Sequence, residues 1–168
     1  MVNKVGAVRV LPVRVLFVCT GNICRSPTAE GVFRELVARE GLSGQVHVDS
    51  ASTHGYHVGD PPDRRSQDSA KKRGIDLSGL RARRTKASDF DEFDYVLAMD
   101  FSNVDALRSL APKSSGKTLQ LLMSFAPGDE IREVPDPYYG DGDGFERVLD
   151  MIEAASAGLL AHIRETYL

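Results

Sequence analysis

The stretch Val15-Leu-Phe-Val-Cys-Thr-Gly-Asn-Ile-Cys-Arg-Ser-Pro27 passes from an apolar segment through a short polar turn into a helix start. Residues 13–18 are apolar apart from Arg14 and rich in valine, a pattern typical of a strand covered on both faces. The polar turn is bracketed by Cys19 and Arg25, with five residues between them. A strand, a tight loop and a helix in this order are the building unit of an α/β protein.

The loop between this strand and helix has the features of an anion-binding site. Gly21 and Asn22 enter left-handed backbone conformations most easily, which can turn successive backbone N–H groups inward. Ser26 and Pro27 are typical of a helix N-cap and first helical residue, and a helix N-terminus adds N–H donors and partial positive charge. Arg25 brings a planar guanidinium that can hold two phosphate oxygens. Together these residues predict a preformed phosphate-binding loop.

Cys19 stands at the mouth of this loop, where the surrounding positive groups should keep it as a thiolate. The alternative is a small buried core residue, a common role of a free cysteine. The strand, the glycine turn, Arg25 and the helix start all agree with a nucleophile instead. The nucleotide-binding motif Gly-x-x-x-x-Gly-Lys-Ser/Thr does not occur in the chain.

Asp136 is the second candidate for chemistry. A thiolate that displaces a phosphate ester needs an acid to protonate the leaving oxygen. Asp136 precedes Pro137, a pair that by itself usually marks a turn, but Tyr138 and Tyr139 follow directly and favour a site. To hold a proton near neutral pH, the carboxyl should be buried by aromatic neighbours.

Two motifs, Cys19-Thr-Gly-Asn-Ile-Cys-Arg-Ser-Pro27 and Asp136-Pro-Tyr-Tyr-Gly140, resemble those of the low-molecular-weight protein tyrosine phosphatases. The resemblance runs from about Val13 to the C-terminal helix, and Thr20 after the cysteine is similar to the bacterial branch. It implies an α/β fold in a single three-layer domain, with a four-stranded parallel sheet in the order 2-1-3-4 and helices on both faces. It also implies hydrolysis of phosphotyrosine through a cysteinyl-phosphate intermediate.

The residues and the resemblance together give each part of the site a role. Cys19 is the nucleophile, Arg25 stabilises the phosphoryl oxygens in the transition state, and Asp136 protonates the leaving group and then activates water. Ser26 is expected to donate its hydroxyl to the Cys19 thiolate, and the resemblance implies that Ser50 supports the loop as a partner of Asn22. The phosphate- and substrate-binding residues are Thr20, Gly21, Asn22, Ile23, Cys24, Ser26, Tyr56, Tyr138 and Tyr139.

Cys24 has two interpretations. The resemblance suggests a reversible Cys19–Cys24 disulfide that protects the nucleophile from over-oxidation. A packing role is the alternative.

Three other activities fit a similar loop. Protein arginine phosphatases resemble it but carry threonine where Ile23 stands and lack the paired tyrosines, so Tyr138, Tyr139 and Ile23 favour phosphotyrosine. Arsenate reductases of this fold need further cysteines downstream, and none follows Cys24. A non-catalytic phosphotyrosine-binding module would lose the nucleophile or the acid, and both are present. Walls formed by Tyr56, Tyr138 and Tyr139 would suit a phosphotyrosyl ring and leave phosphoserine short of the nucleophile.

The composition fits one globular domain of 168 residues, 42% hydrophobic and 27% charged. A net charge of −3 argues against a nucleic-acid partner, and the lack of a long apolar run argues against a membrane span. Two cysteines five positions apart favour a reducing, cytoplasmic compartment. We expect a phosphotyrosyl protein or peptide as substrate, and a monomer or weak dimer. Residues 1–12 should form a flexible extension to a catalytic domain of residues 13–168.

No metal or other cofactor is expected. His54 and His57 share a loop, but no further ligand has matching spacing. Asp141-Gly-Asp-Gly144 suggests a calcium loop, yet that alignment puts Tyr139 and Asp150 where Asp and a bidentate Glu belong. Asp143 is better interpreted as a cap of the last helix.

Hydrophobic spacing and turn residues predict the remaining elements. A helix should follow the loop and stop at Gly41, and a long terminal helix should start near Phe145. Ser102 is expected to cap a helix that runs to Leu110, and residues 81–86 form a cationic connector interpreted as a solvated face. The other expected elements are strands at 46–50, 94–99 and 118–123, a surface loop at 51–65 and a short helix at 66–73 ended by Gly74.

Overall fold

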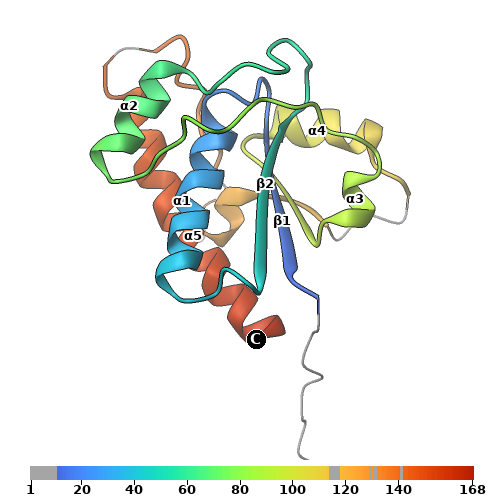
Figure 1. The fold of residues 1–168 in the computed structure, drawn as a ribbon. Coiled ribbons are helices and arrows are strands. Elements are labelled where there is room, and N and C mark those ends of the chain that lie inside the picture. The colour runs from blue at the N-terminus through green and yellow to red at the C-terminus, as the bar shows by residue number, and fades with distance from the viewer. Residues whose placement is uncertain (1–10, 114–117, 129, 131, 141) are drawn as a thin grey trace, which may run out of the picture.

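The computed structural model describes residues 11–113, 118–128, 130, 132–140 and 142–168, and most of the predicted N-terminal extension lies outside these residues. Four parallel strands form one sheet in the order β2-β1-β3-β4, which confirms the predicted topology (Figure 1). In chain order the elements are β1 (Val13–Cys19), α1 (Arg25–Arg39), β2 (Val46–Ser52), α2 (Arg64–Lys72), α3 (Asp89–Glu92), β3 (Tyr95–Ala98), α4 (Phe101–Leu110), β4 (Leu119–Leu121), the 3₁₀ helix η1 (Leu122–Phe125) and α5 (Gly144–Tyr167).

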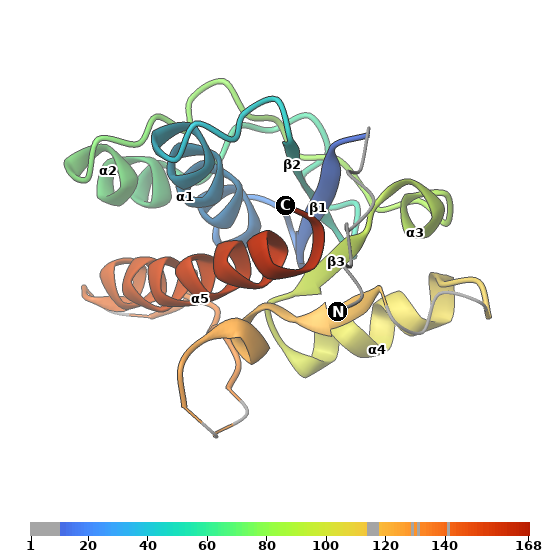
Figure 2. The ribbon, with the colours of Figure 1, turned by 90° about the horizontal axis from the view of Figure 1, so that it is seen from below.

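Helices cover both faces of the sheet, as the view from below shows (Figure 2). Helices α1, α2 and α5 lie on one side, and α3 and α4 lie on the other. Because side chains alternate along a strand, Val15 and Phe17 of β1 join the core under α1 and α5, while Leu16 and Val18 join the core under α3 and α4. This double burial is why β1 shows an almost continuous apolar run.

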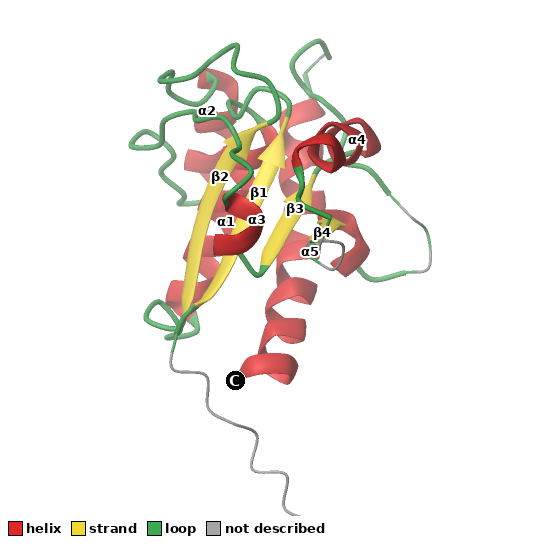
Figure 3. Ribbon diagram, turned by 90° about the vertical axis from the view of Figure 1, so that its right-hand side faces the viewer, coloured by secondary structure: helices red, strands yellow, loops and turns green. Residues whose placement is uncertain are grey.

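The carboxyl ends of all four strands meet at one edge of the sheet (Figure 3). Strand β1 lies between β2 and β3, so the chain runs from β1 to β2 in one direction along the sheet and then from β2 past β1 to β3 in the other. Such a switch point opens a crevice in which open α/β sheets bind ligands. Cys19, the last residue of β1, therefore lies at the expected binding edge.

Two predicted helix caps are wrong. Helix α1 begins at Arg25 with Cys24 at the N-cap, so Ser26 is its second residue and faces Cys19 instead of the helix backbone. Helix α4 is capped by Asp100, whose carboxylate accepts from the Asn103 backbone N–H at 2.7 Å. Both helices therefore begin two residues earlier than predicted, α1 at Arg25 and α4 at Phe101.

The edge strand and the cationic connector also differ from expectation. Strand β4 ends at Leu121, where the chain turns into η1. This 3₁₀ helix lies close to α5, since a Cβ added to Gly158 would overlap the Phe125 carbonyl oxygen. Arg83 of the connector is 30% exposed and pairs with Asp49 and the buried Asp89, each at 3.0 Å. The connector is therefore tied to the sheet and is not a simple solvated face.

The other boundaries shift by a few residues. Helix α2 starts two residues earlier than expected and is capped by Asp63, and Gly74 ends it with a positive φ of 79°. Asp143 occupies the N-cap position of α5 without a side-chain cap bond. Helix α3 was not predicted. No helix within the described residues has the length and apolar character to cross a membrane.

Candidate active site

Asn22 shapes the loop between β1 and α1. Its φ of 56° is the left-handed conformation predicted for this turn. Its side-chain amide donates to Ser26 Oγ at 2.7 Å and to Ser50 Oγ at 3.0 Å, and its Oδ1 accepts from the Arg83 N–H at 3.0 Å. These bonds join the loop to α1, to β2 and to the connector after α2. The loop is therefore held in shape by parts of the chain far apart in sequence.

The sulfur of Cys19 lies inside this loop and is nearly inaccessible, with 2% of the residue exposed. Cys19 Sγ is 2.9 Å from Ser26 Oγ and accepts from the Asn22 N–H at 3.2 Å. Because the Asn22 amide already donates to Ser26 Oγ, the serine hydrogen can point to the sulfur. Two donors thus converge on the Cys19 sulfur.

Arg25 is the first residue of α1 and is 2% exposed. Its Nη1 donates to Asp100 Oδ2 at 2.6 Å and to the Val134 carbonyl at 3.0 Å, which fixes the plane of the guanidinium. Its Nη2 lies 3.5 Å from Thr20 Oγ1 and 3.8 Å from Asp136 Oδ2, on the side of the cavity. Burial opposes the charge, but the negative sulfur of Cys19 and the Asp100 carboxylate outweigh it and raise the pKa of Arg25.

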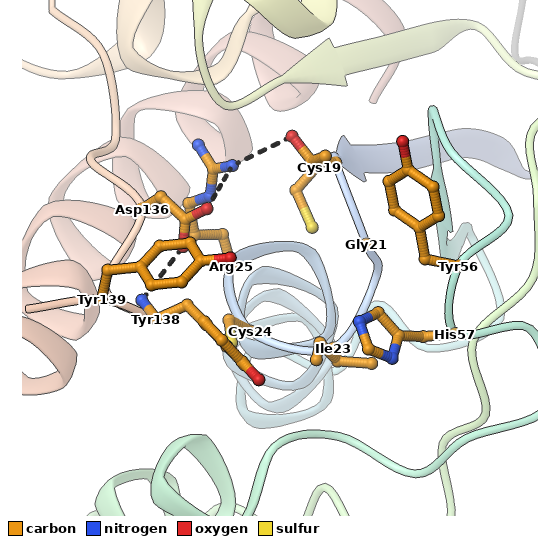
Figure 4. Close-up of a pocket in the computed structure, with 11 residues that line it drawn as sticks. Cys19, Gly21, Ile23, Cys24, Arg25, Tyr56, His57, Asp136, Tyr138 and Tyr139 are labelled. Carbon is orange, nitrogen blue, oxygen red and sulfur yellow. Dashed lines mark hydrogen bonds and ion pairs between the residues drawn. The ribbon is translucent and has the colours of Figure 1, made fainter.

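A cavity of about 230 Å³ opens above the loop (Figure 4). Tyr138 and Tyr139 lie on one side of it and Tyr56 and His57 on the other. The tyrosines are exposed, from 40% for Tyr138 to 90% for Tyr139, so they rim the mouth of the cavity more than they enclose it. The lining residues are Cys19, Thr20, Gly21, Ile23, Cys24, Arg25, Tyr56, His57, Asp136, Tyr138 and Tyr139.

Asp136 reaches this cavity from the segment that follows η1. Its Oδ1 accepts from the Tyr138 N–H at 3.0 Å, a short turn that directs the carboxylate toward Arg25. The expectation that aromatic neighbours bury it is wrong, since its side chain is 45% exposed. The two tyrosines pack against each other edge-on, with ring centroids 4.9 Å apart, and leave the carboxylate open to solvent.

Cys24 is a second buried thiol beside the cavity, and both cysteines are free. Burial, together with the negative charges of Asp63 and Cys19, raises the pKa of the Cys24 thiol to about 12. Cys24 therefore stays protonated at neutral pH.

The chain matches the model of a known protein family. A family model described as low molecular weight phosphotyrosine protein phosphatase matches residues 14–167. The chain belongs to this family. It is therefore a low-molecular-weight protein tyrosine phosphatase, as the two motifs suggested.

Relatives of this phosphatase match over nearly their whole length. It is 48% identical over 156 residues to a low molecular weight protein-tyrosine-phosphatase of Streptomyces coelicolor, covering 90% of this chain and 94% of the relative. It is 41% identical over 153 residues to YfkJ of Bacillus subtilis, covering 91% and 97%. The YfkJ crystal structure matches with a TM-score of 0.88, 40% identity and coverage of 94% and 98%. The crystal structure of a Drosophila arginine phosphatase matches with a TM-score of 0.83, 36% identity and coverage of 89% and 97%.

Several residues around the site of this phosphatase were missed from the sequence. Asp100 binds Arg25, and Asn103 donates to Thr20 Oγ1 at 3.1 Å. Both residues follow the end of β3. The rule that ligands bind beyond the carboxyl ends of parallel strands could therefore have identified them from the sequence. His57 lines the cavity, and an added Cβ on Gly21 would come within 3.1 Å of its ring. No sequence signal separated His57 from an ordinary loop histidine.

Glu30 extends the hydrogen-bonded network behind the loop. Its carboxylate, 4% exposed within α1, accepts from Ser50 Oγ at 3.0 Å and from Arg34 at 2.9 Å. Through Ser50 and Asn22 it connects to Ser26, which contacts the nucleophile candidate. Burial raises the pKa of Glu30, although Arg34 and Ser50 oppose the shift.

The two histidines of the loop after β2 have partners other than a metal. His54 stacks on Tyr56 with ring centroids 5.3 Å apart, and His57 Nδ1 lies 3.2 Å from Asp60 Oδ2. Across the described part of the chain, no group of three or more His, Cys, Asp or Glu side chains is arranged to hold a metal ion.

Proposed function

We propose that this phosphatase hydrolyses phosphotyrosine in proteins, and small aryl phosphates, through a phosphocysteine at Cys19. The observation that carries the proposal is the convergence of three groups on one cavity: the Cys19 sulfur, Nη2 of Arg25 and the Asp136 carboxylate. A nucleophile, an oxyanion stabiliser and an acid in that arrangement support transfer of a phosphoryl group to sulfur and then to water.

In the first step, the Cys19 thiolate attacks phosphorus from the floor of the cavity, and the bond between phosphorus and the phenolic oxygen breaks. Asp136 gives its proton to that oxygen, so a neutral phenol leaves instead of a phenolate. Backbone N–H groups of the loop and Nη2 of Arg25 hold the three equatorial oxygens. Asp100 supports this step indirectly because it fixes the guanidinium plane through Nη1.

In the second step, water attacks phosphorus, Asp136 accepts a proton from that water, and the sulfur–phosphorus bond breaks. Inorganic phosphate leaves and Cys19 returns to a thiolate. The Ser26 hydroxyl, 2.9 Å from the sulfur, stabilises this thiolate as it departs. The exposed position of Asp136 gives water direct access to its carboxylate.

The rim favours an aromatic substrate. Tyr138 and Tyr56 on opposite sides of the mouth offer ring faces to a phosphotyrosyl side chain, and Ile23 adds an apolar contact in the cavity. Phosphoarginine is the second candidate, because one matching structure is an arginine phosphatase. An assay on phosphotyrosyl, phosphoseryl and phosphoarginyl peptides, with a metal chelator present, decides between them. A higher kcat/KM for phosphoarginine would overturn the choice of tyrosine.

Two variants test the mechanism. Cys19→Ser should abolish turnover of an aryl phosphate and still bind inorganic phosphate, because the loop and Arg25 remain. Asp136→Asn should lower kcat/KM by about 10²- to 10⁴-fold for aryl phosphates with poor leaving groups, and by much less for good ones. Retained turnover by Cys19→Ser, or an equal loss across all leaving groups for Asp136→Asn, would contradict the assignment.

A further inference from the structure

Arg65, near the start of α2, contacts the side of the cavity that is formed by Tyr138. Its Nη1 donates to the Tyr138 carbonyl at 3.2 Å, across 73 positions of sequence. Its guanidinium carbon also lies 5.2 Å from the ring centroid of Tyr138 and 4.7 Å from that of Phe145, within the range of a cation–π contact. One side chain thus contacts both the segment that carries Asp136 and the first turn of α5.

Asp63 links Arg65 to the phosphate-binding loop between Cys19 and Arg25. Arg65 Nε and Nη2 donate to the two carboxylate oxygens of Asp63 at 3.1 and 3.0 Å, a bidentate pair. Asp63 caps α2 through the Arg65 backbone N–H, and its own N–H donates to the Ile23 carbonyl at 2.7 Å. Arg65 is therefore fixed in direction by a residue bonded directly to the loop between Cys19 and Arg25.

Tyr138 connects Arg65 to Asp136 through its backbone. Its carbonyl is held by Arg65, and its N–H donates to Asp136 Oδ1 at 3.0 Å. The direction of the Asp136 carboxylate therefore depends on where the Tyr138 backbone lies. We propose that Arg65 is a positioning residue, which holds the segment of Asp136 and Tyr138 at a fixed distance from the phosphate-binding loop so that the acid meets the leaving oxygen.

The proposal, which rests on Asp136 as the general acid, has a specific kinetic consequence. Without Arg65 the segment is held at fewer points, and a displacement of about 1 Å is enough to impair a proton transfer by about 10²-fold. The loop around Cys19 keeps its own hydrogen bonds to Ser26 and Asn22. Loss of Arg65 should therefore slow substrates that need the proton and leave phosphate binding nearly unchanged.

The experiment compares Arg65→Ala and Arg65→Lys with Arg64→Ala, which removes an exposed positive charge from the same turn of α2. Each variant is assayed for kcat/KM with aryl phosphates that differ in leaving group, and for inhibition by inorganic phosphate. We expect Arg65→Ala to lose about ten-fold or more with the poorest leaving group and less than two-fold with the best. Lysine lacks the planar fork and should restore little, and Arg64→Ala should match the unmodified enzyme.

A double variant separates this proposal from the assignment of Asp136. In the Asp136→Asn background, Arg65→Ala should cause no further loss, because there is no acid left to position. If Asp136→Asn itself shows no dependence on the leaving group, the proposed mechanism fails. If Asp136→Asn does depend on the leaving group, three results for Arg65→Ala would each contradict its positioning role. They are an equal loss of kcat/KM for all substrates, a loss in the Asp136→Asn background as large as in the unmodified enzyme, and a parallel weakening of inhibition by phosphate. Arg65→Lys provides the same measurements if the alanine variant does not fold.

Discussion

Removal of the Ser26 hydroxyl tests how the loop stabilises the Cys19 sulfur. In Ser26→Ala the sulfur loses a donor at 2.9 Å and keeps the Asn22 N–H at 3.2 Å. In the proposed mechanism the sulfur leaves phosphorus as a thiolate when water attacks the phosphocysteine. A hydrogen bond to a charged group contributes about 1.5–3 kcal/mol, and about 1.4 kcal/mol corresponds to a ten-fold change in rate. Breakdown of the phosphocysteine should therefore slow by about ten- to one-hundred-fold.

Rapid mixing with an aryl phosphate measures this step, because slow breakdown of the phosphocysteine gives a burst of released phenol followed by a slower steady rate. Thr28→Val is the matched control, since Thr28 is buried in the same turn of α1 and donates to the Cys24 carbonyl at 2.7 Å. An unchanged rate of phosphocysteine breakdown in Ser26→Ala, or an equal loss in Thr28→Val, would refute the reasoning.

Two further predictions concern stability and are checked by urea unfolding. Gly158→Ala should cost about 2 kcal/mol, because the new Cβ overlaps the backbone carbonyl of Phe125. Gly31→Ala should cost less, because its Cβ meets only side-chain atoms, of Leu77 and Ile75, which can shift, and because alanine is the better helix former. Equal effects of the two alanines would contradict this distinction. Burial raises the pKa of Glu30 above 4.5, so the fold favours the protonated carboxyl and loses stability as pH rises from 4.5 through the raised pKa. As the pH increases through this range, the free energy of unfolding of Glu30→Gln should therefore increase relative to that of the unmodified protein. A difference in unfolding free energy that stays constant with pH would argue against a raised pKa.

Local sequence was sufficient where a residue type itself restricts the backbone. Asn22 adopts the left-handed conformation expected of it, and Gly74 ends α2 with a positive φ. The apolar run of β1 predicted a strand covered on both faces because each face needs its own hydrophobic contacts. Helix caps were less predictable: α1 begins after Cys24 without a side-chain cap bond, and α4 uses Asp100 in place of the expected Ser102.

The supporting residues of the site could not be found from the sequence. Asp100 is 75 positions from Arg25, and Arg65 is 73 positions from Tyr138, so no local spacing connects either pair. Glu30 in α1 resembles a solvent-facing charge until β2 brings Ser50 against it. The expected burial of Asp136 was wrong because the tyrosines beside it pack on each other and on Arg65 instead of covering the carboxylate.

The sequence by itself determined the chemistry available to this protein: a cysteine and an arginine spaced around a tight loop, and an aspartate ahead of two tyrosines. Those features depend on residue type and short spacing, which a single chain displays directly. Only the tertiary structure decided how the three groups face one cavity and which partners hold them there. The physical reason is that parallel strands bring the ends of distant segments to one edge of the sheet, where Asp100, Ser50 and Arg65 complete contacts that no local pattern records.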